Sequence, residues 1–519
     1  MNRDISLQRM IDRDESWDIA VIGGGATGVG IAVDAAARGY AVCLLEQSDF
    51  GKATSSRSTK LVHGGVRYLQ QGNIALVTEA LHERGILKNN APHLVHDLAF
   101  VVPNYQWWEG PFYGIGLKAY DLLAGKYGFG KSRHLSRKEV LRYIPTLKTD
   151  GLRGGVLYHD GQFDDARLLL DLAATATRLG AALLNYAPAT HLLHDAAGRL
   201  HAVRFADSET GQAHTVAARC IINATGAFSD QLRHMDDPAA RGIIAPSQGV
   251  HLVLERTFLS GDTAIMVPHT SDGRVLFAVP WHNRTLLGTT DTALNGVTLE
   301  PVPQDAEIDF ILDTAGQYLA RAPKRSDVVS MFAGIRPLVK APQNTSTAAL
   351  SRDHTIDISS SGLLTIAGGK WTTYRRMAED AVDHAASIGG LPARECSTRT
   401  LKICGSPHCD PIDTARGMIT SASMSLTESD LAAGPFAINA EEIIYFVRHE
   451  MARTIDDILA RRTRLLFVDA RAAVAAAPHV ALTMATELGR DKPWIENQIL
   501  EFNAIAKNYL PPAAIDTNP

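Results

Sequence analysis

Five side chains that could bind and deprotonate an anionic molecule stand beside turn-forming residues, where distant segments of a chain can meet in one pocket. Arginine binds phosphate through paired hydrogen bonds and lysine acts as a point charge, so several of them together would form an anion site. For any single arginine, a surface ion pair is the simpler interpretation. The five candidates are Arg67, His251, Arg336, Arg352 and Lys370.

One of these candidates could act as a base. An imidazole near neutral pH can remove a hydroxyl proton while a hydride leaves the adjacent carbon. His251 lies two residues after Gly249, beside a predicted strand. A structural histidine within that strand is the competing interpretation, and it applies equally to His63.

The densest cluster of reactive side chains is the run Thr-Lys-Leu-Val-His-Gly-Gly-Val-Arg-Tyr-Leu-Gln at residues 59–70. It combines the cations Lys60 and Arg67 with His63 and the aromatic ring of Tyr68. Its glycines allow tight turns and close approach of the backbone to a ligand. The run therefore predicts an active-site loop.

A glycine motif precedes this loop and follows a short apolar strand at residues 18–22. Gly23 permits a tight turn, Gly25 lets the backbone approach a pyrophosphate, and Gly28 lets helix and strand pack closely. Phosphate would then bind the free N–H groups at the start of the helix. Glu46 ends the next strand about 20 residues further on, where a carboxylate can bind ribose hydroxyls. The motif predicts a dinucleotide site.

Two later segments, residues 220–226 and 362–374, repeat the pattern of an apolar strand followed by a turn of small residues. A helix at residues 165–179 and strands near residues 182–186 and 201–205 precede the first of them. This α/β rhythm predicts one parallel sheet, and three distant glycine turns predict a discontinuous cofactor domain. An ordinary buried strand end is the alternative for residues 220–226.

The segments between these turns predict a second, inserted domain. Short strands with Gly, Asn and Asp turns are expected near residues 251–254, 274–279 and 285–287. Apolar residues at helical spacing predict a helix at residues 305–319.

Helices are expected to dominate the C-terminal region, after a linker near residues 405–411. The clearest is predicted over residues 441–466, where an apolar stripe recurs at helical spacing. The arginines of this segment are then expected on a solvated face: Arg448, Arg453, Arg461 and Arg462.

Bulk composition limits the remaining options. At 519 residues the chain is long enough for two or three domains, and a net charge of −5 gives no general attraction to nucleic acid. The polar residues 1–16 exclude a secretory signal, and no window reaches the roughly 18 apolar residues of a spanning helix. We expect a cytoplasmic protein, soluble or peripheral to a membrane.

The five cysteines are too few and too scattered for a disulfide framework, which fits a reducing compartment. Cys404 and Cys409 flank His408, but their spacing matches no zinc pattern, so we expect no metal.

The chain resembles the flavin-dependent glycerol-3-phosphate dehydrogenases from about residue 17 to the C-terminal helices. The loop and the Gly-Gly-Lys motif are specific, whereas many flavoproteins share the first glycine motif. Arg57 and Trp371 depart from the commoner pattern of the family. The matching segments are residues 53–69, 223–226, 288–291, 334–338, 368–375, 445–450 and 461–465.

The resemblance implies an α/β fold: a discontinuous Rossmann-like FAD-binding domain, an inserted substrate domain built on an antiparallel sheet, and an α-helical C-terminal cap. The expected divisions are residues 15–95, 150–235 and 345–390 for the first, 96–149 and 236–344 for the second, and 391–519 for the third.

The resemblance also implies FAD as cofactor and sn-glycerol 3-phosphate as substrate. Hydride would pass from C2 to flavin N5, giving dihydroxyacetone phosphate, and the electrons would continue to a membrane quinone. His251 would be the base and Arg336 would oppose developing charge. The substrate-binding residues would be Arg67, Tyr68, Arg352 and Lys370, with Arg67 facing the substrate.

The cofactor-binding residues are carried over from the same motifs, and Lys60 and His63 are expected to shape the flavin side. The set is Gly23, Gly25, Gly28, Glu46, Thr54, Ser55, Ser58, Lys60, His63, Gly65, Ala224, Gly226, Gly369 and Thr372.

Use of a quinone requires a membrane surface, which we expect at the cytoplasmic face of the inner membrane. Residues 106–123 combine interfacial aromatics with apolar residues in one amphipathic segment. A buried domain helix is the equal alternative. A homodimer is left open.

Three other functions compete. An oxidase would reoxidise the same flavin with dioxygen, and related flavoproteins oxidise amines and amino acids on similar folds. The clustered cations favour a phosphate ester over an amine. A noncatalytic flavin-binding scaffold is the alternative from another class.

Overall fold

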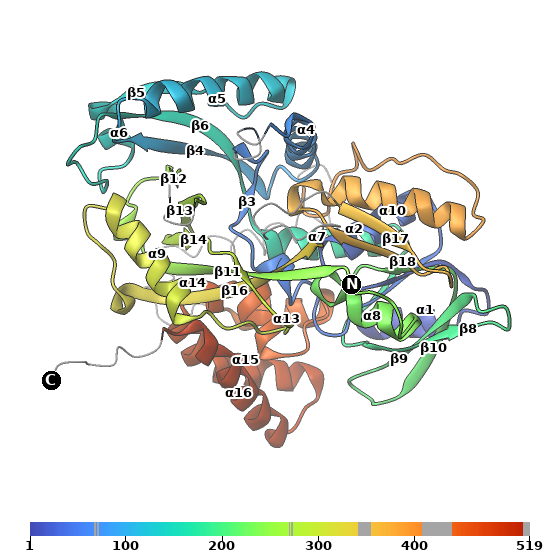
Figure 1. The fold of residues 1–519 in the computed structure, drawn as a ribbon. Helices are drawn as coiled ribbons and strands as arrows, with labels where there is room; N and C mark the ends of the chain where they lie inside the picture. The colour runs from blue at the N-terminus through green and yellow to red at the C-terminus, as the bar shows by residue number, and fades with distance from the viewer. Residues whose placement is uncertain are drawn as a thin grey trace.

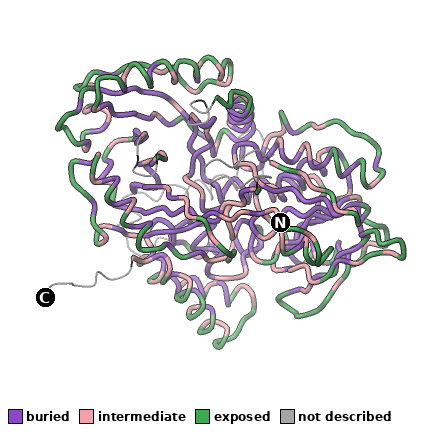
Figure 2. The backbone as a smooth tube through the Cα atoms, in the orientation of Figure 1, coloured by how far each residue is buried: buried purple, intermediate pink, exposed green. Residues whose placement is uncertain are grey.

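The computed structural model describes residues 1–66, 69, 72–268, 270, 273–340, 354–406 and 438–511. Two large sheets lie next to each other, with helices on their outer faces and a helical block beneath (Figure 1). Buried residues run through both sheets, and exposed residues lie on the outer helices (Figure 2).

The first sheet carries the predicted dinucleotide motif. Its central strands pair in parallel, while β17 at one edge and the β8–β9 extension are antiparallel. The predicted parallel sheet therefore ends in an antiparallel ladder. Its order is β17 (His354–Ile358), β18 (Leu364–Gly368), β10 (Ala213–Asn223), β1 (Trp17–Ile22), β2 (Val42–Leu45) and β7 (Ala182–Leu184), with β9 (Leu200–Ala206) and β8 (Ala189–His194) beyond β10.

Three helices cover this sheet: α2 (Ala26–Ala37), α7 (Asp165–Arg178) and α10 (Tyr374–Ile388). The buried residues of α2 include almost its whole length, because the helix lies between α7 and α10. Strands from residues 17–45, 213–223 and 364–368 thus meet in one sheet, as the three separate glycine turns predict.

The second sheet is mainly antiparallel, as expected of the inserted domain. Only β12 and β4 pair in parallel among its described strands. Its order is β15 (Thr292–Ala293), β11 (Ile244–Glu255), β14 (Arg284–Gly288), β13 (Leu276–Trp281), β12 (Ala264–Val267), β4 (Val95–Asn104), β6 (Gly154–Phe163) and β3 (Leu61–Val62), with β16 (Val328–Val339) on β11 and β5 (Arg133–Ser136) on β6.

The sheet boundary differs from the division expected at residue 150. β6 pairs with β4 along its whole length and therefore lies in the second sheet, as does the short β3. Long-range pairing decides this position, and no local pattern in residues 150–163 reports it. The outer helices of this region are α4 (Ile74–Asn90), α5 (Glu109–Ala124), α6 (Arg137–Tyr143) and α9 (Asp305–Tyr318).

The helical C-terminal block is present, but the single helix predicted over residues 441–466 is wrong. The first helix ends at His449, and Met451 takes a left-handed φ of 58°. The apolar stripe did not reveal that Arg461 and Arg462 bind Asp49, some 412 residues away. The block comprises α13 (Ala440–His449), π-helix η8 (Asp457–Arg462), α14 (Leu465–Val468), α15 (Ala470–Leu488) and α16 (Lys492–Ala506).

The N-terminal residues form a helix of their own, α1 (Arg3–Ile11), which contacts β7 and β10. Arg3 is buried and pairs with Asp207 at 2.5 Å. Across the described ranges, no helix is long and apolar enough to cross a bilayer.

Candidate active site

A cavity of about 380 Å³ opens at the carboxyl ends of β1, β10 and β18, where the three predicted glycine turns meet. This is the position at which open α/β sheets bind their ligands. Most of the predicted cofactor residues line it: Gly23, Gly25, Glu46, Thr54, Ser55, Ser58, His63, Ala224, Gly226, Gly369 and Thr372.

Close backbone contacts explain the glycines. A Cβ on Gly28 would lie 1.8 Å from the carbonyl oxygen of Gly23, and a Cβ on Gly23 would lie 2.5 Å from that of Ala224. Gly28 therefore holds the helix against the strand and does not line the cavity. Gly23 also has a φ of 111°, which side chains disfavour.

Glu46 braces the turn while lining the cavity. Its carboxylate accepts hydrogen bonds from the N–H groups of Gly24 (2.6 Å) and Ser48 (2.9 Å). Burial raises the pKa of Glu46, and those two hydrogen bonds partly offset the increase.

The segment after β2 closes one wall of the cavity. The N–H of Ala26 donates to Ser55 Oγ (2.9 Å), and Thr54 Oγ1 donates to the carbonyl of Ile335 (2.6 Å). Both residues that depart from the commoner family pattern hold this segment. The indole of Trp371 donates to the carbonyl of Ser55 (2.8 Å), and Arg57 pairs with Glu300 (2.7 Å).

His251 lies at the inner end of the cavity on β11. Its Nε2 is 2.9 Å from Thr59 Oγ1, and its ring stacks on Phe332 with 4.9 Å between centroids. Burial first, and then the charges of Lys60 and Arg336, lower the pKa of His251 well below 6.5. The imidazole is therefore neutral at pH 7 and can accept a proton.

Arg336 lies beside His251 on β16. Its guanidinium donates to the carbonyl of Thr290 (2.9 Å) and to Thr289 Oγ1 (3.1 Å), and it pairs with Asp291 at 3.4 Å. Lys370, in the turn after β18, lines the same cavity. The predicted base and two predicted cations thus share one chamber.

A second cavity, of about 160 Å³, continues from this chamber under the antiparallel sheet. The two cavities share four lining residues: Thr59, Leu61, His63 and Arg336. Gly65 lines the second cavity only. The shared residues mark the junction where a small molecule would meet the larger ligand.

The structure adds Arg274 and Asp291 to this second cavity. Arg274 was missed, although it directly follows Gly273 and so fits the same turn-adjacent criterion as the other arginines. Asp291 lies 3.7 Å from Arg274 and fixes both guanidinium groups near the junction.

Lys60 does not shape the flavin side of the pocket as expected. It lines neither cavity, is fully buried, and binds Asp165 (2.7 Å) and the carbonyl of Ser56 (2.7 Å). Burial and the charge of Arg464 lower the pKa of Lys60 to about 7. Its ammonium group is directed to Asp165, and its charge contributes to the lowered pKa of His251.

Three predicted substrate residues, Arg67, Tyr68 and Arg352, lie outside the described residues, as does Cys409. Their placement in the site stays a prediction. Within the described ranges, no group of three or more His, Cys, Asp or Glu side chains could hold a metal ion.

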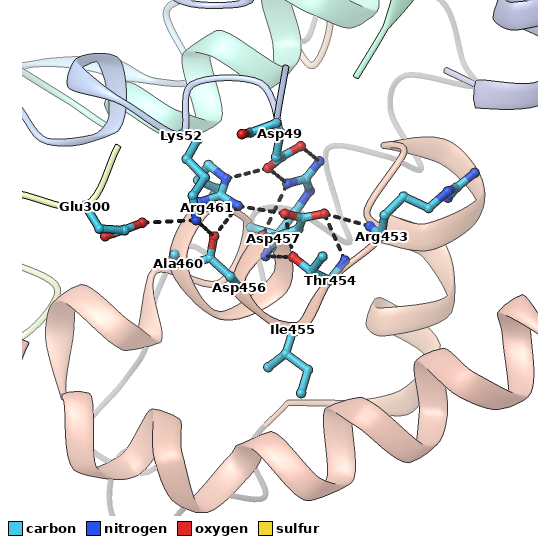
Figure 3. Close-up of polar contacts among 12 residues, drawn as sticks. Asp49, Lys52, Glu300, Arg453, Thr454, Ile455, Asp456, Asp457, Ala460 and Arg461 are labelled. Atoms are coloured by element: carbon cyan, nitrogen blue, oxygen red, sulfur yellow. Dashed lines mark hydrogen bonds and ion pairs between the residues drawn. The ribbon is translucent and has the colours of Figure 1, made fainter. Parts of the chain in front are cut away.

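A buried ion cluster supports the cavity wall from the C-terminal block (Figure 3). Lys52 pairs with Asp456 (2.6 Å) and Glu300 (3.0 Å), and Arg461 pairs with both Asp456 (2.8 Å) and Asp49. Burial alone would raise the pKa of Asp49, but Arg462 and Arg461 outweigh it and lower that pKa. Lys52 itself lines the cavity, so the cluster fixes a segment of the cavity wall.

The glycine cradle, the brace at Glu46 and the shared junction fit a flavin dinucleotide, because Gly23 and Gly28 allow the close backbone packing of the turn and Gly25 lines the cavity without a side chain. Fold and cavity thus define a flavoprotein of the oxidoreductase class. A family model described as FAD dependent oxidoreductase matches residues 18–375, and one described as the C-terminal domain of alpha-glycerophosphate oxidase matches residues 413–494.

Proteins that are similar to this chain over nearly its whole length narrow the assignment within this class. The chain is 41% identical to the mitochondrial glycerol-3-phosphate dehydrogenase of Homo sapiens, over 93% of this chain and 72% of that protein. It is also 41% identical to the corresponding Arabidopsis thaliana protein, over 92% and 83%. The FAD complex of glycerol-3-phosphate dehydrogenase from Bacillus halodurans superposes with a TM-score of 0.77 at 29% identity, covering 98% of both chains.

The chain belongs to the family of FAD-dependent glycerol-3-phosphate dehydrogenases, and its cofactor is FAD. A glycerophosphate oxidase from Mycoplasma pneumoniae with FAD bound, 17% identical with a TM-score of 0.58, shares the fold.

Proposed function

We propose that this protein oxidises sn-glycerol 3-phosphate to dihydroxyacetone phosphate and passes the electrons to a membrane quinone. The observation that carries the proposal is the convergence of His251, Arg336 and Lys370 on the cavity that the predicted flavin-binding residues also line. A neutral base beside two cations suits a substrate that combines a secondary hydroxyl with a phosphate.

Bound FAD supplies the hydride acceptor, with N5 receiving the hydride from C2 of the substrate. His251 takes the proton of the C2 hydroxyl, because its lowered pKa keeps the imidazole neutral before the reaction. Thr59 orients the ring through Nε2, and Phe332 supports its face. Arg336 opposes the negative charge that develops on the oxygen.

Lys370 binds the phosphate of the substrate, and Arg67, Tyr68 and Arg352 bind the substrate with it. Arg274, held near Asp291 in the second cavity, adds a further cation within the substrate's reach. The chamber favours a phosphate ester over an amine, since an amine would meet these cations with like charge.

Delivery of electrons to a quinone requires contact with a lipid surface, which we assign to the outer face of α5. The exposed apolar side chains of this region are Trp107 (77% exposed), just before the helix, and Phe112 (51%), Ile115 (73%) and Leu122 (83%) on it. Lys118 is exposed on the same helix, and Lys126 is exposed just after it. Their positive charges complement anionic head groups. The protein would then sit on the cytoplasmic face of the inner membrane, as a monomer or homodimer.

Anaerobic addition of sn-glycerol 3-phosphate to the holoprotein tests the proposal, because transfer of a hydride bleaches the flavin absorbance. Bleaching by this substrate and not by glycerol or amino acids is expected. A flavin that stays oxidised would instead indicate a noncatalytic scaffold.

The electron acceptor is tested separately. Reduced enzyme should be reoxidised rapidly by a soluble quinone analogue, with little hydrogen peroxide formed in air. Stoichiometric hydrogen peroxide with slow quinone reduction would identify an oxidase.

A further inference from the structure

The hydroxyl of Tyr120 joins α5 to the loop that carries His63. It donates to Asp160 Oδ2 (2.7 Å) and accepts the N–H of Gly64 (2.8 Å). The side chain of Tyr120 is only 1% exposed. A Cβ on Gly64 would lie 2.5 Å from the Tyr120 hydroxyl oxygen. The loop backbone therefore packs so close to Tyr120 that position 64 has no room for a side chain.

Asp160 fixes the tyrosine from the other side. Arg84 of α4 pairs with Asp160 at 2.5 Å and also donates to the carbonyl of Tyr127 (3.2 Å). Burial first, and then Asp160, raise the pKa of Tyr120 well above 10, so the hydroxyl remains a donor throughout the physiological range. The Arg84–Asp160–Tyr120 chain therefore holds the tyrosine hydroxyl in place as the acceptor for the Gly64 N–H.

The loop is held on its opposite side by the cofactor turn. The N–H of His63 donates to Thr372 Oγ1 (3.2 Å), and Thr372 lines the flavin cavity. His63 lines both cavities and Gly65 lines the second. Residues 63–66 are thus clamped between α5 and the turn after β18, at the junction where we place the substrate.

The same helix carries the exposed apolar side chains on its outer face. Phe112, Ile115 and Leu122 point outward, whereas Tyr113, Leu117 and Tyr120 are buried. A helix moves as one element, so a shift of its outer face is transmitted to the hydroxyl that holds Gly64.

We infer that Tyr120 is a positioning residue through which an anionic lipid surface on α5 sets the geometry of residues 63–66 and hence the binding of substrate. The inference rests on the proposed function for the substrate and the lipid surface. It adds a role for a residue that lines neither cavity.

Tyr120→Phe removes the hydroxyl and keeps the ring. Loss of the two hydrogen bonds leaves a buried N–H unpaired, so the half-saturating concentration of sn-glycerol 3-phosphate in stopped-flow flavin reduction should rise about 10-fold. The limiting rate should change less than about 3-fold, because His251 and the flavin cavity are untouched. Tyr105→Phe is the matched control, since its hydroxyl donates only to the surface carbonyl of Lys148 (2.9 Å).

Phosphatidylglycerol vesicles test the coupling between lipid binding on α5 and substrate binding. They should lower the half-saturating concentration of the unaltered enzyme and of Tyr105→Phe by at least about 3-fold, as expected if lipid favours the ordered loop by a modest coupling free energy. Tyr120→Phe should bind the vesicles equally well in sedimentation, with no change in half-saturation.

Each negative result of these experiments would overturn a different part of the proposals. No bleaching of the unaltered enzyme by the substrate would overturn the proposed function itself. Normal bleaching with an unchanged half-saturating concentration in Tyr120→Phe would overturn the positioning role alone. A vesicle response that survives in Tyr120→Phe, or is missing in the unaltered enzyme, would overturn the coupling.

Discussion

Thr59 Oγ1 lies 2.9 Å from Nε2 of His251, which joins the active-site loop to strand β11 of the antiparallel sheet. Thr59 lines both cavities, and His251, although only 3% exposed, lines the larger of them. The loop and the base are therefore positioned by each other, although 192 residues separate them.

His251→Asn should slow flavin reduction by at least about 100-fold, because the amide cannot take the C2 hydroxyl proton. Single-turnover stopped-flow absorbance measures this rate without interference from the acceptor. His201→Asn, on an exposed position of β9, should keep the original rate. An unchanged rate in His251→Asn would remove the residue from the role of base.

Thr59→Val should reduce the limiting rate of flavin reduction about 10-fold, since a neutral hydrogen bond that orients the imidazole is lost. Thr59→Ser keeps the hydroxyl and should recover most of the rate. A full rate in Thr59→Val together with a loss in Thr59→Ser would show that packing of the methyl group, and not the hydrogen bond, matters.

The neutral state of His251 predicts a pH dependence. Its folded-state pKa lies well below 6.5, so the low-pH limb of the flavin-reduction rate should also lie well below pH 6.5. The unfolded chain binds this proton first as pH falls, so the folded state loses stability below about pH 6.5. Urea unfolding from pH 7.5 to 5 should show a weaker loss in His251→Asn than in the unaltered protein.

Asp49→Asn should destabilise the protein by about 3–5 kcal/mol, because Arg461 and Arg462 would lose the buried carboxylate that they share. It should also weaken FAD retention during dialysis, since Lys52 of the same cluster lines the cofactor cavity. Asp383→Asn is the control, an exposed partner of Arg38 at 58% exposure, with an expected effect below about 1 kcal/mol. Equal urea midpoints for the two variants would contradict the supporting role of the cluster.

Trp107→Ala with Trp108→Ala should reduce sedimentation with phosphatidylglycerol vesicles several-fold, because interfacial indoles contribute much of the apolar contact. Leu500→Ala, an equally exposed apolar residue on α16, should not change sedimentation. Retained partitioning of the double variant would place the lipid contact elsewhere.

The sequence alone predicted the parts of the fold that depend on local backbone geometry. Gly23 and Gly28 stand where a side chain would overlap neighbouring backbone. The glycine motif in the sequence therefore predicts the turn that it forms. The same applies to α9, whose apolar spacing predicted its bounds to within one residue. The family resemblance added the cofactor, because the matching motifs belong to a family that binds FAD.

The sequence did not predict which charges meet inside the molecule. Lys60 and His63 are neighbours in one loop, yet Lys60 is buried against Asp165 while His63 lines both cavities. Arg461 belongs to a segment with an apolar stripe and was expected to face solvent. It instead pairs with the carboxylate of Asp49, in the segment after β2.

The turns and strands could be predicted from the sequence, since their periodicity and glycine requirements act within a few residues. The folded molecule was needed to show that His251, Arg336 and Lys370 share a chamber, that Tyr120 holds Gly64, and that β6 joins the second sheet. Pairing between distant strands and between buried charges depends on the whole fold, which no local pattern contains.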